Sequence, residues 1–114
     1  MANIYLINLE NTDIYKIGVT NGDPNKRLKN LQVGSPYKLI FVKSFASTYG
    51  AKLEGILHRA YSAQKVSSMD GQELLGEWFE LSNLDVKNFE TRCESITKNL
   101  DIIKVSTTLD NFLS

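Results

Sequence analysis

The pattern of apolar and polar positions predicts two strands and a helix in the amino-terminal part of the chain. Residues 4–9 (IYLINL) and 14–20 (IYKIGVT) are rich in β-branched and aromatic side chains, which favour strands. The polar segment ENTD separates them, and so short a connection is typical of an antiparallel hairpin. Residues 24–33 then place Leu28 and Leu31 on the inner face of a predicted helix.

The next part of the chain alternates between strand-like and helix-like patterns. Residues 37–45 (YKLIFVKSF) are apolar on both faces, which is typical of a central strand. Residues 47–65 repeat apolar side chains at helical spacing and predict a helix. We expect a loop over residues 66–76 and a short strand or extended segment over residues 77–81 (EWFEL). A last helix begins after a cap at position 82 or 83. Its expected inward positions are Leu84, Phe89, Cys93, Ile96 and Leu100.

These elements predict one domain of the α+β class. We expect a small, mostly antiparallel sheet of three strands flanked by helices, contained in residues 1–100. Residues 101–114 are ambiguous, because their pattern fits either a strand with a short terminal helix or a loosely docked arm. A chain of 114 residues is long enough for one hydrophobic core and too short for two.

Composition indicates a globular chain without a membrane segment. No apolar run approaches the roughly 18 residues of a membrane span. The amino terminus lacks the basic region and long apolar stretch of a secretion signal. Cys93 is the single cysteine, so no internal disulfide can form, and its helical spacing with Phe89 and Ile96 favours a buried hydrophobic position. We therefore expect a cytoplasmic protein with no membrane partner.

Charges are balanced overall but unevenly distributed along the chain. The formal net charge is zero, which argues against indiscriminate binding to polyanions. Between residues 16 and 43, however, Asp23 is the single acidic residue among six basic ones. These are Lys16, Lys26, Arg27, Lys29, Lys38 and Lys43. Acidic residues dominate between positions 70 and 94, so we expect one face of the domain to attract anions.

A lysine interrupts the second predicted strand. Strand alternation puts Lys16 on the same face as Ile14 and Gly18, and the hairpin brings that face close to Tyr5. A cation beside a phenol favours the phenolate, which makes the tyrosine a more useful base. Gly18 would let a backbone or a phosphate approach closely. The alternative is that Tyr5 is a half-buried strand residue and Lys16 extends to solvent.

Several motifs together resemble the GIY-YIG nuclease superfamily. NIY is followed in order by YKIGVT, RLKNLQVGSPYKL, AKLEGILHRAY and GEWFEL. Their order and spacing are similar to the phage- and fungus-associated branch of that superfamily, and the resemblance spans residues 3–82. It implies a GIY-YIG-like fold and a phosphodiesterase that uses one divalent metal ion, Mg²⁺ or Mn²⁺.

The resemblance also implies roles for individual residues. Tyr5 falls on the tyrosine that acts as general base and activates water. Lys16 falls on the tyrosine position of the second motif, a replacement that this branch shares. Arg27 would hold the scissile phosphate and stabilise developing charge. Glu54 would bind the metal as a hard oxygen ligand suited to Mg²⁺.

Two further motif residues have roles that stay open. His58 lies one helical turn after Glu54, so both can face one edge of a cleft, where His58 could bind phosphate or transfer a proton to the leaving group. The alternative for His58 is a half-buried structural position. Glu77 can supply a carboxylate near the site, or its segment can be structural, with Trp78 closing the core.

The sequence thus predicts a divalent-metal-dependent DNA endonuclease. Four lysines are expected to contact the nucleic acid. These are Lys26, Lys29, Lys38 and Lys43. DNA is the expected partner, although the sequence does not separate DNA from RNA. Specificity would come from the cleft itself, from a homodimer or from a protein partner. The alternative hypothesis is a GIY-YIG-like module that binds nucleic acid or protein without cutting.

Overall fold

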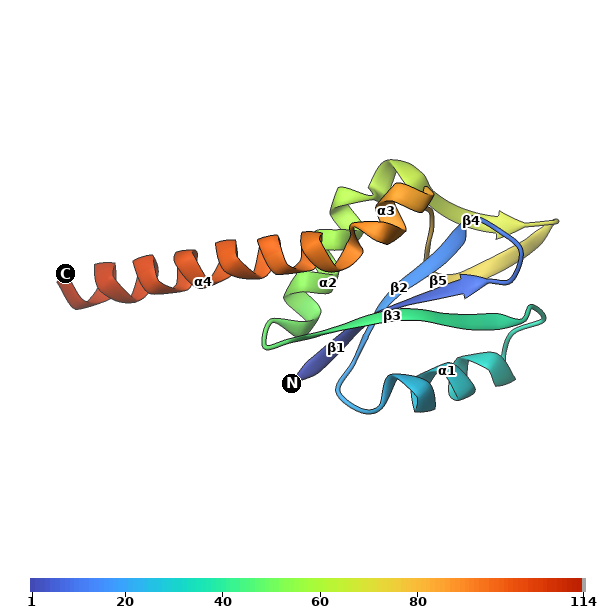
Figure 1. The fold of residues 1–114 in the computed structure, drawn as a ribbon, viewed down its shortest axis with the longest axis horizontal. Helices are drawn as coiled ribbons and strands as arrows, with labels where there is room; N and C mark the ends of the chain where they lie inside the picture. Colours follow the sequence, from blue (N-terminus) through green and yellow to red (C-terminus); the bar gives the residue numbers. More distant parts are fainter. Residues whose placement is uncertain (114) are drawn as a thin grey trace.

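A five-stranded antiparallel sheet forms the centre of the computed structural model, which describes the backbone of residues 1–113 and the side chains of residues 1–107 (Figure 1). The strand order across the sheet is β3-β1-β2-β5-β4. The strands are β1 (Ala2–Leu9), β2 (Ile14–Thr20), β3 (Leu39–Ser47), β4 (Lys65–Met69) and β5 (Gln72–Glu80). The helices are α1 (Pro24–Val33), α2 (Gly50–Ala60), the 3₁₀ turn η1 (Ser62–Gln64), α3 (Asn83–Lys87) and α4 (Phe89–Leu113).

The α+β class and the amino-terminal hairpin are confirmed. Strands β1 and β2 pair antiparallel with Tyr5 opposite Gly18 and Ile7 opposite Lys16. Helix α1 begins after Asp23, whose side chain accepts a hydrogen bond from the backbone N–H of Asn25. The expected third strand is also present, shifted by two residues toward the carboxyl end.

The expectation of a three-stranded sheet is wrong, because residues 66–76 are not a loop. Most of them belong to a second hairpin, β4 and β5, which turns at Asp70 and Gly71, both with positive φ. The pattern conceals these strands because most of their side chains are exposed and polar, while Leu75 is exposed and apolar. β5 pairs with β2 through Ile14, Tyr15 and Lys16, which joins the two hairpins into one sheet.

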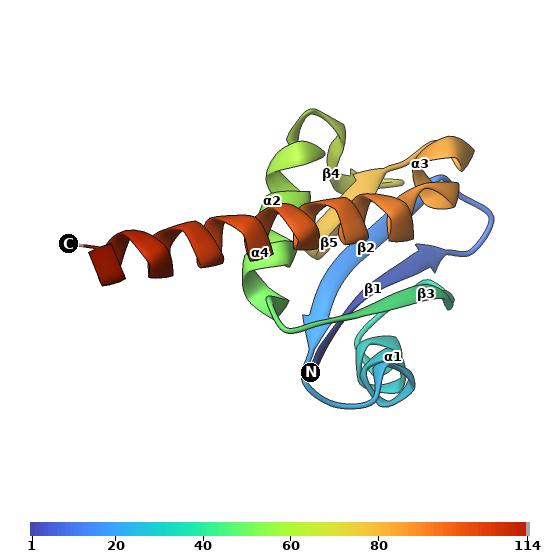
Figure 2. The same ribbon diagram turned by 60° about the vertical axis from the view of Figure 1, so that its left-hand side comes forward.

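Each face of the sheet is covered by different helices (Figure 2). On one face, Leu28 and Leu31 of α1 pack on a cluster that contains Tyr5, Ile7 and Trp78. On the other, α2 and α4 cover the main core. Its buried members are Ile4, Leu6, Ile17, Leu53, Leu57, Tyr61, Phe79, Leu81, Phe89 and Cys93. Adjacent residues of one strand therefore serve two separate clusters, as strand alternation requires.

The carboxyl-terminal part continues as a helix, so the strand that was one of the two alternatives for residues 101–114 does not form within the described residues. Helix α4 continues to Leu113 and projects beyond the sheet, so no strand forms there; residue 114 lies outside the described residues (Figure 1). Ile102, Ile103 and Val105 are mostly exposed on this extension. Leu84 was expected to point inward and is exposed, because its helix α3 is a separate short element before α4. Among the described helices, none has the length and hydrophobicity to cross a membrane.

Candidate functional site

The phenol ring of Tyr5 lies directly over Gly18 on the α1 face of the sheet. A Cβ atom at Gly18 would lie 2.3 Å from the ring carbon Cζ and the hydroxyl oxygen of Tyr5, so a side chain at position 18 would displace the ring. Tyr5 is only 2% exposed. The Tyr5 hydroxyl makes no hydrogen bond within the described residues. It is also not one of the fully buried polar atoms without a partner in that part of the chain, so the phenol oxygen touches solvent.

Lys16 is buried on the same face, next to Tyr5. The side chain is 9% exposed, and its Nζ atom lies 5.4 Å from the centroid of the Trp78 ring. Gly76 makes room for the ammonium group: a Cβ atom there would lie 2.3 Å from Nζ, and the φ of +96° suits glycine. Burial lowers the pKa of Lys16, as does the positive charge of Arg27, while Glu54 and Glu77 act in the opposite direction.

Arg27, Glu54 and Glu77 thus all act electrostatically on Lys16, although they come from α1, α2 and β5. α2 packs its buried Leu53 and Leu57 against the face opposite to α1. β5 pairs with β2 only as far as Lys16, so the rest of β2 forms an open edge. Glu54 is half-buried and adjacent to the buried Leu53, and its charge acts on Lys16 from this helix. It makes no ion pair within the described part of the chain.

His58 fixes α2 against the open edge of β2. Its Nε2 atom lies 2.7 Å from the backbone carbonyl oxygen of Ile17, and its ring stacks on Phe79 with centroids 5.4 Å apart. Because a carbonyl oxygen only accepts, Nε2 is the nitrogen that donates to Ile17. These contacts give His58 a structural role in positioning the helix that carries Glu54.

Glu77 is the second carboxylate near Lys16. It forms an ion pair with Lys65 across the β4–β5 hairpin, with Nζ and Oε2 3.0 Å apart. The hydrogen bond from Lys65 lowers the pKa of Glu77, and the charges of Lys65, His58 and Lys16 lower it further. Glu77 therefore stays ionised beside Lys16 and partly compensates its buried charge.

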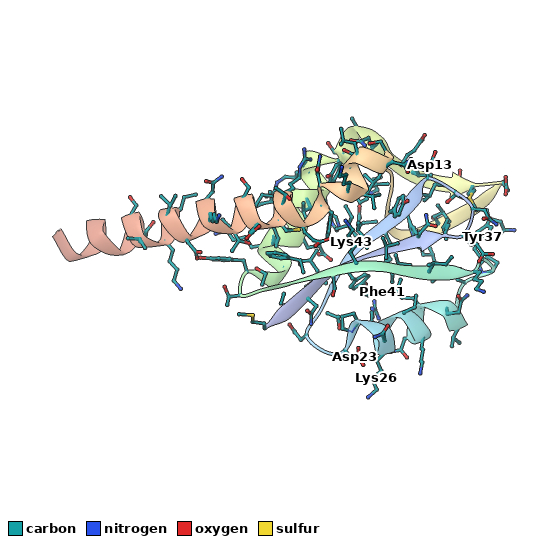
Figure 3. The ribbon with its side chains drawn as sticks, in the orientation of Figure 1. Asp13, Asp23, Lys26, Tyr37, Phe41 and Lys43 are labelled. Carbon is teal, nitrogen blue, oxygen red and sulfur yellow. The ribbon has the colours of Figure 1, made fainter. Side chains whose placement is uncertain are left out.

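The structure separates the four lysines that were expected to form one basic surface. Lys26 and Lys29 are exposed on α1, the helix that carries Arg27, and Lys26 points away from the sheet (Figure 3). Lys38 is at the start of β3, where it lies 3.9 Å from Glu10 in an exposed ion pair. The expectation that Lys38 joins the basic surface is not met, because it lies beyond the carboxyl-terminal end of α1.

Lys43 also lies away from the α1 surface. It is paired in register with Leu6, whose side chain belongs to the core on the opposite face, and Figure 3 shows it on the other side of β3 from α1. Its Nζ atom donates to the carbonyl oxygen of Val86 at 2.7 Å and lies 3.0 Å from Glu90. Lys43 therefore caps the carboxyl end of α3 instead of facing a nucleic acid.

The described residues offer a divalent cation separate carboxylates and no cluster of ligands. Among the described residues, no group of three or more histidine, cysteine, aspartate or glutamate side chains could enclose a metal ion. A half-buried carboxylate without an ion-pair partner, Glu54, nevertheless suits Mg²⁺ or Mn²⁺. Such ions are commonly held by one or two carboxylates, with water and phosphate oxygens in the other positions.

The fold and these side chains define a small α+β domain with a buried lysine on the sheet face that an exposed basic helix covers. The chain belongs to the T5orf172 domain family, because the family's model matches residues 2–97. This membership is consistent with nucleic-acid binding and with nuclease chemistry. Comparison with curated proteins finds no match, and neither does comparison with solved structures.

The family match corrects the resemblance drawn from the sequence motifs. The expected membership of the GIY-YIG nuclease superfamily is wrong: the family shown is that of the T5orf172 domain, a different family, and no match to GIY-YIG appears. The roles of individual residues therefore have to be argued from their positions in this structure.

Gly76 is a site residue that the sequence analysis did not single out. The feature of the sequence that could have identified it is the glycine of GEWFEL, two residues before Trp78, which pairs with Lys16. Trp78 was assigned to the core. The structure confirms its burial and adds that its ring supports the Lys16 ammonium group.

The contact between Tyr5 and Gly18 predicts a loss of stability in Gly18→Ala. The added methyl group would overlap the phenol ring, and overpacking of this kind costs about 1–3 kcal/mol of unfolding free energy. Gly34→Ala is the matched control, since a Cβ there meets nothing within 4 Å and φ is −92°. Urea unfolding checks both variants, and equal midpoints would contradict the packing of Tyr5 on Gly18.

The buried charge of Lys16 predicts that Lys16→Met is more stable than the wild type at pH 7. Because folding lowers the pKa of Lys16, the folded state holds its proton less tightly than the unfolded state, so the protonated lysine destabilises the fold. This cost is fully present below the lowered pKa and disappears as the pH rises toward 10.5. The difference in unfolding free energy between Lys16→Met and the wild type, measured by urea unfolding, should therefore become smaller between pH 7 and pH 10.

Lys26→Met is the control for this experiment, because Lys26 is exposed on α1. It should leave the unfolding free energy almost unchanged at every pH. A stability difference for Lys16→Met that stays constant over the pH range would contradict the buried charge.

Proposed function

We propose that this chain is a divalent-metal-dependent nuclease that hydrolyses phosphodiester bonds in DNA. The observation that carries the proposal is the buried ammonium of Lys16, which lies beside the phenol of Tyr5 and is acted on by Arg27 and Glu54. A buried, incompletely neutralised cation is costly to a fold and is typical of functional sites. The charge of an incoming phosphate would compensate it.

In this proposal Tyr5 is the general base and Lys16 supports it. Tyr5 and Lys16 stand two residues apart along neighbouring strands on one face. As the base, Tyr5 would take a proton from the attacking water. Because Gly18 and Gly76 lack a Cβ atom, the Tyr5 ring and the Lys16 ammonium group fit in the space next to them.

Arg27 and Glu54 supply the remaining functions. Arg27 is exposed on α1 and would bind the scissile phosphate, where a guanidinium stabilises negative charge that develops during hydrolysis. Glu54 would hold Mg²⁺ or Mn²⁺, with Glu77 as a further carboxylate close to Lys16. When bound, such an ion neutralises charge on the phosphate and on the leaving oxygen. His58 acts as a positioning residue, because it orients α2 through Ile17.

A second candidate function is nucleic-acid binding without hydrolysis. Two observations favour it: the ring of Tyr5 is almost fully buried, and the described residues contain no group of three metal ligands. Both functions use the same basic helix, so binding alone does not separate them. Cleavage does.

Removal of the Glu54 carboxylate or of the Lys16 charge should abolish most cleavage. We expect Glu54→Gln and Lys16→Met to lower the single-turnover rate at pH 7 by about 100-fold or more, the usual scale for the loss of such groups. Higher pH should restore part of the loss in Lys16→Met, because more phenolate then forms without the cation. The measurement uses supercoiled plasmid with Mg²⁺ or Mn²⁺ at saturating protein, from pH 6 to pH 9.

Glu94→Gln is the matched control, because Glu94 is an exposed carboxylate on α4. It should cut at the wild-type rate. Parallel pH profiles with equal plateaus for wild type and Lys16→Met would exclude the catalytic role of Lys16. Absence of cleavage by the wild type with either metal would favour the binding function.

The exposed lysines of α1 predict salt-dependent binding. Reversal of Lys26 and Lys29 to Glu should weaken DNA binding and lower the slope of log K against log salt by about 2, since each phosphate contact contributes about 0.9. The control reverses Lys38 and Lys98, which are exposed on other surfaces. Fluorescence anisotropy in a salt titration measures the affinity and the salt slope of each double variant. Equal slopes for the two double variants would argue against α1 as the binding surface.

A further inference from the structure

A cavity of about 260 Å³ opens on the same sheet face as the proposed site, at the other end of α1. It lies between the last turn of α1, the segment of residues 34–37 and strand β5. Lys16 and Trp78 contribute to its lining, so the cavity is adjacent to the buried ammonium group. The other lining residues that matter here are Asn30, Leu31, Tyr37 and Leu74.

Hydrogen bonds hold the aromatic side chains of this cavity in place. The Tyr37 hydroxyl donates to the carbonyl oxygen of Met69 at 3.0 Å, which ties the segment after α1 to the β4–β5 hairpin. Trp78 donates from Nε1 to the carbonyl oxygen of Leu75 at 2.9 Å. Leu75 also lines the cavity and is 80% exposed, so a large apolar side chain at this opening is left uncovered. The cavity is therefore preformed and apolar.

Strand register sets the distance from this cavity to the proposed phosphate site. Along β1, Tyr5 is followed on the same face by Ile7, opposite Lys16, and then by Leu9, which lines the cavity. Successive residues on one face of a strand are about 7 Å apart. Arg27 lies one helical turn before Asn30 and Leu31, which line the cavity, so a nucleotide next to a phosphate at Arg27 would have its base near the cavity.

We propose that this cavity receives one unstacked base of the bound nucleic acid. The proposal rests on the nuclease function above, since it takes the phosphate near Arg27 as its starting point. The indole of Trp78 can stack on a base, and Leu74 adds an apolar contact. The ammonium of Lys16 can donate to base carbonyl oxygens. At the opening, the exposed Asn30 can both donate and accept, and the exposed Glu73 can accept from base N–H groups.

The experiment fills the cavity and compares a strand with and without bases. Gly34 lines the cavity, and a Cβ there meets nothing within 4 Å, so Gly34→Leu adds bulk without a clash. Val33→Phe is the matched control, because the neighbouring Val33 is 90% exposed and does not line the cavity. Asn30→Ala is a second test that cannot disturb the core, since Asn30 is exposed.

The probes are a fluorescein-labelled ten-residue thymidine oligonucleotide and an abasic ten-mer with the same phosphates, both without metal. Fluorescence anisotropy should show that the wild type prefers the thymidine strand by about tenfold, the scale of one stacked base. Trp78, the single tryptophan, should be quenched by an unlabelled thymidine strand and not by the abasic one. Gly34→Leu should lose the preference and the quenching, Asn30→Ala should reduce the preference, and Val33→Phe should keep both.

The base-binding cavity would be overturned if Gly34→Leu kept the full preference for the thymidine strand and the full quenching of Trp78. Equal affinity of the wild type for the thymidine and abasic strands would also overturn it. Failure of the nuclease function gives a different result: the thymidine preference would remain sensitive to Gly34→Leu while plasmid with metal stays uncut. Absence of binding to either strand would overturn both proposals.

Discussion

The burial of a single ammonium group organises this fold around its site. Lys16 stands on the central strand of the sheet, paired in register with Ile7 on one side and Trp78 on the other, and is 9% exposed. Desolvation of a charge is expensive unless other charges and polar groups compensate it. Here the compensation comes from Glu54 on α2 and Glu77 on β5, together with the face of the Trp78 ring. Two elements that are distant from β2 in sequence, α2 and β5, therefore supply the groups that compensate this one side chain.

Two glycines make this arrangement possible, each through the absence of a Cβ atom. Gly18 leaves space for the Tyr5 ring and Gly76 for the Lys16 ammonium, so two polar-tipped side chains fit on one crowded face. Gly76 also joins the second hairpin to the site, because it precedes the segment of β5 that pairs with β2. The β4–β5 hairpin therefore carries Gly76 and Trp78 next to Lys16 and also forms one edge of the sheet.

Local patterns predicted the parts of the fold whose burial is one-sided and regular. The hairpin of residues 4–20 and the helix that buries Leu53 and Leu57 have strong periodicities, and both are present. The β4–β5 hairpin was missed because its strands face solvent and lack apolar alternation. Lys43 could not be placed from sequence, since its partners, the carbonyl of Val86 and Glu90, lie more than 40 positions away.

The two faces of the sheet differ in how deeply their covering helices are packed. The face under α2 and α4 holds the larger core, and it also buries Lys43 in the cap of α3. The face under α1 carries the smaller cluster, and its covering helix has no fully buried residue. A helix held by two half-buried leucines leaves polar side chains beneath and beside it accessible to a ligand. Strand alternation therefore lets eight residues of β1 serve both purposes: Ile4 and Leu6 stabilise the domain, while Tyr5 between them faces the site.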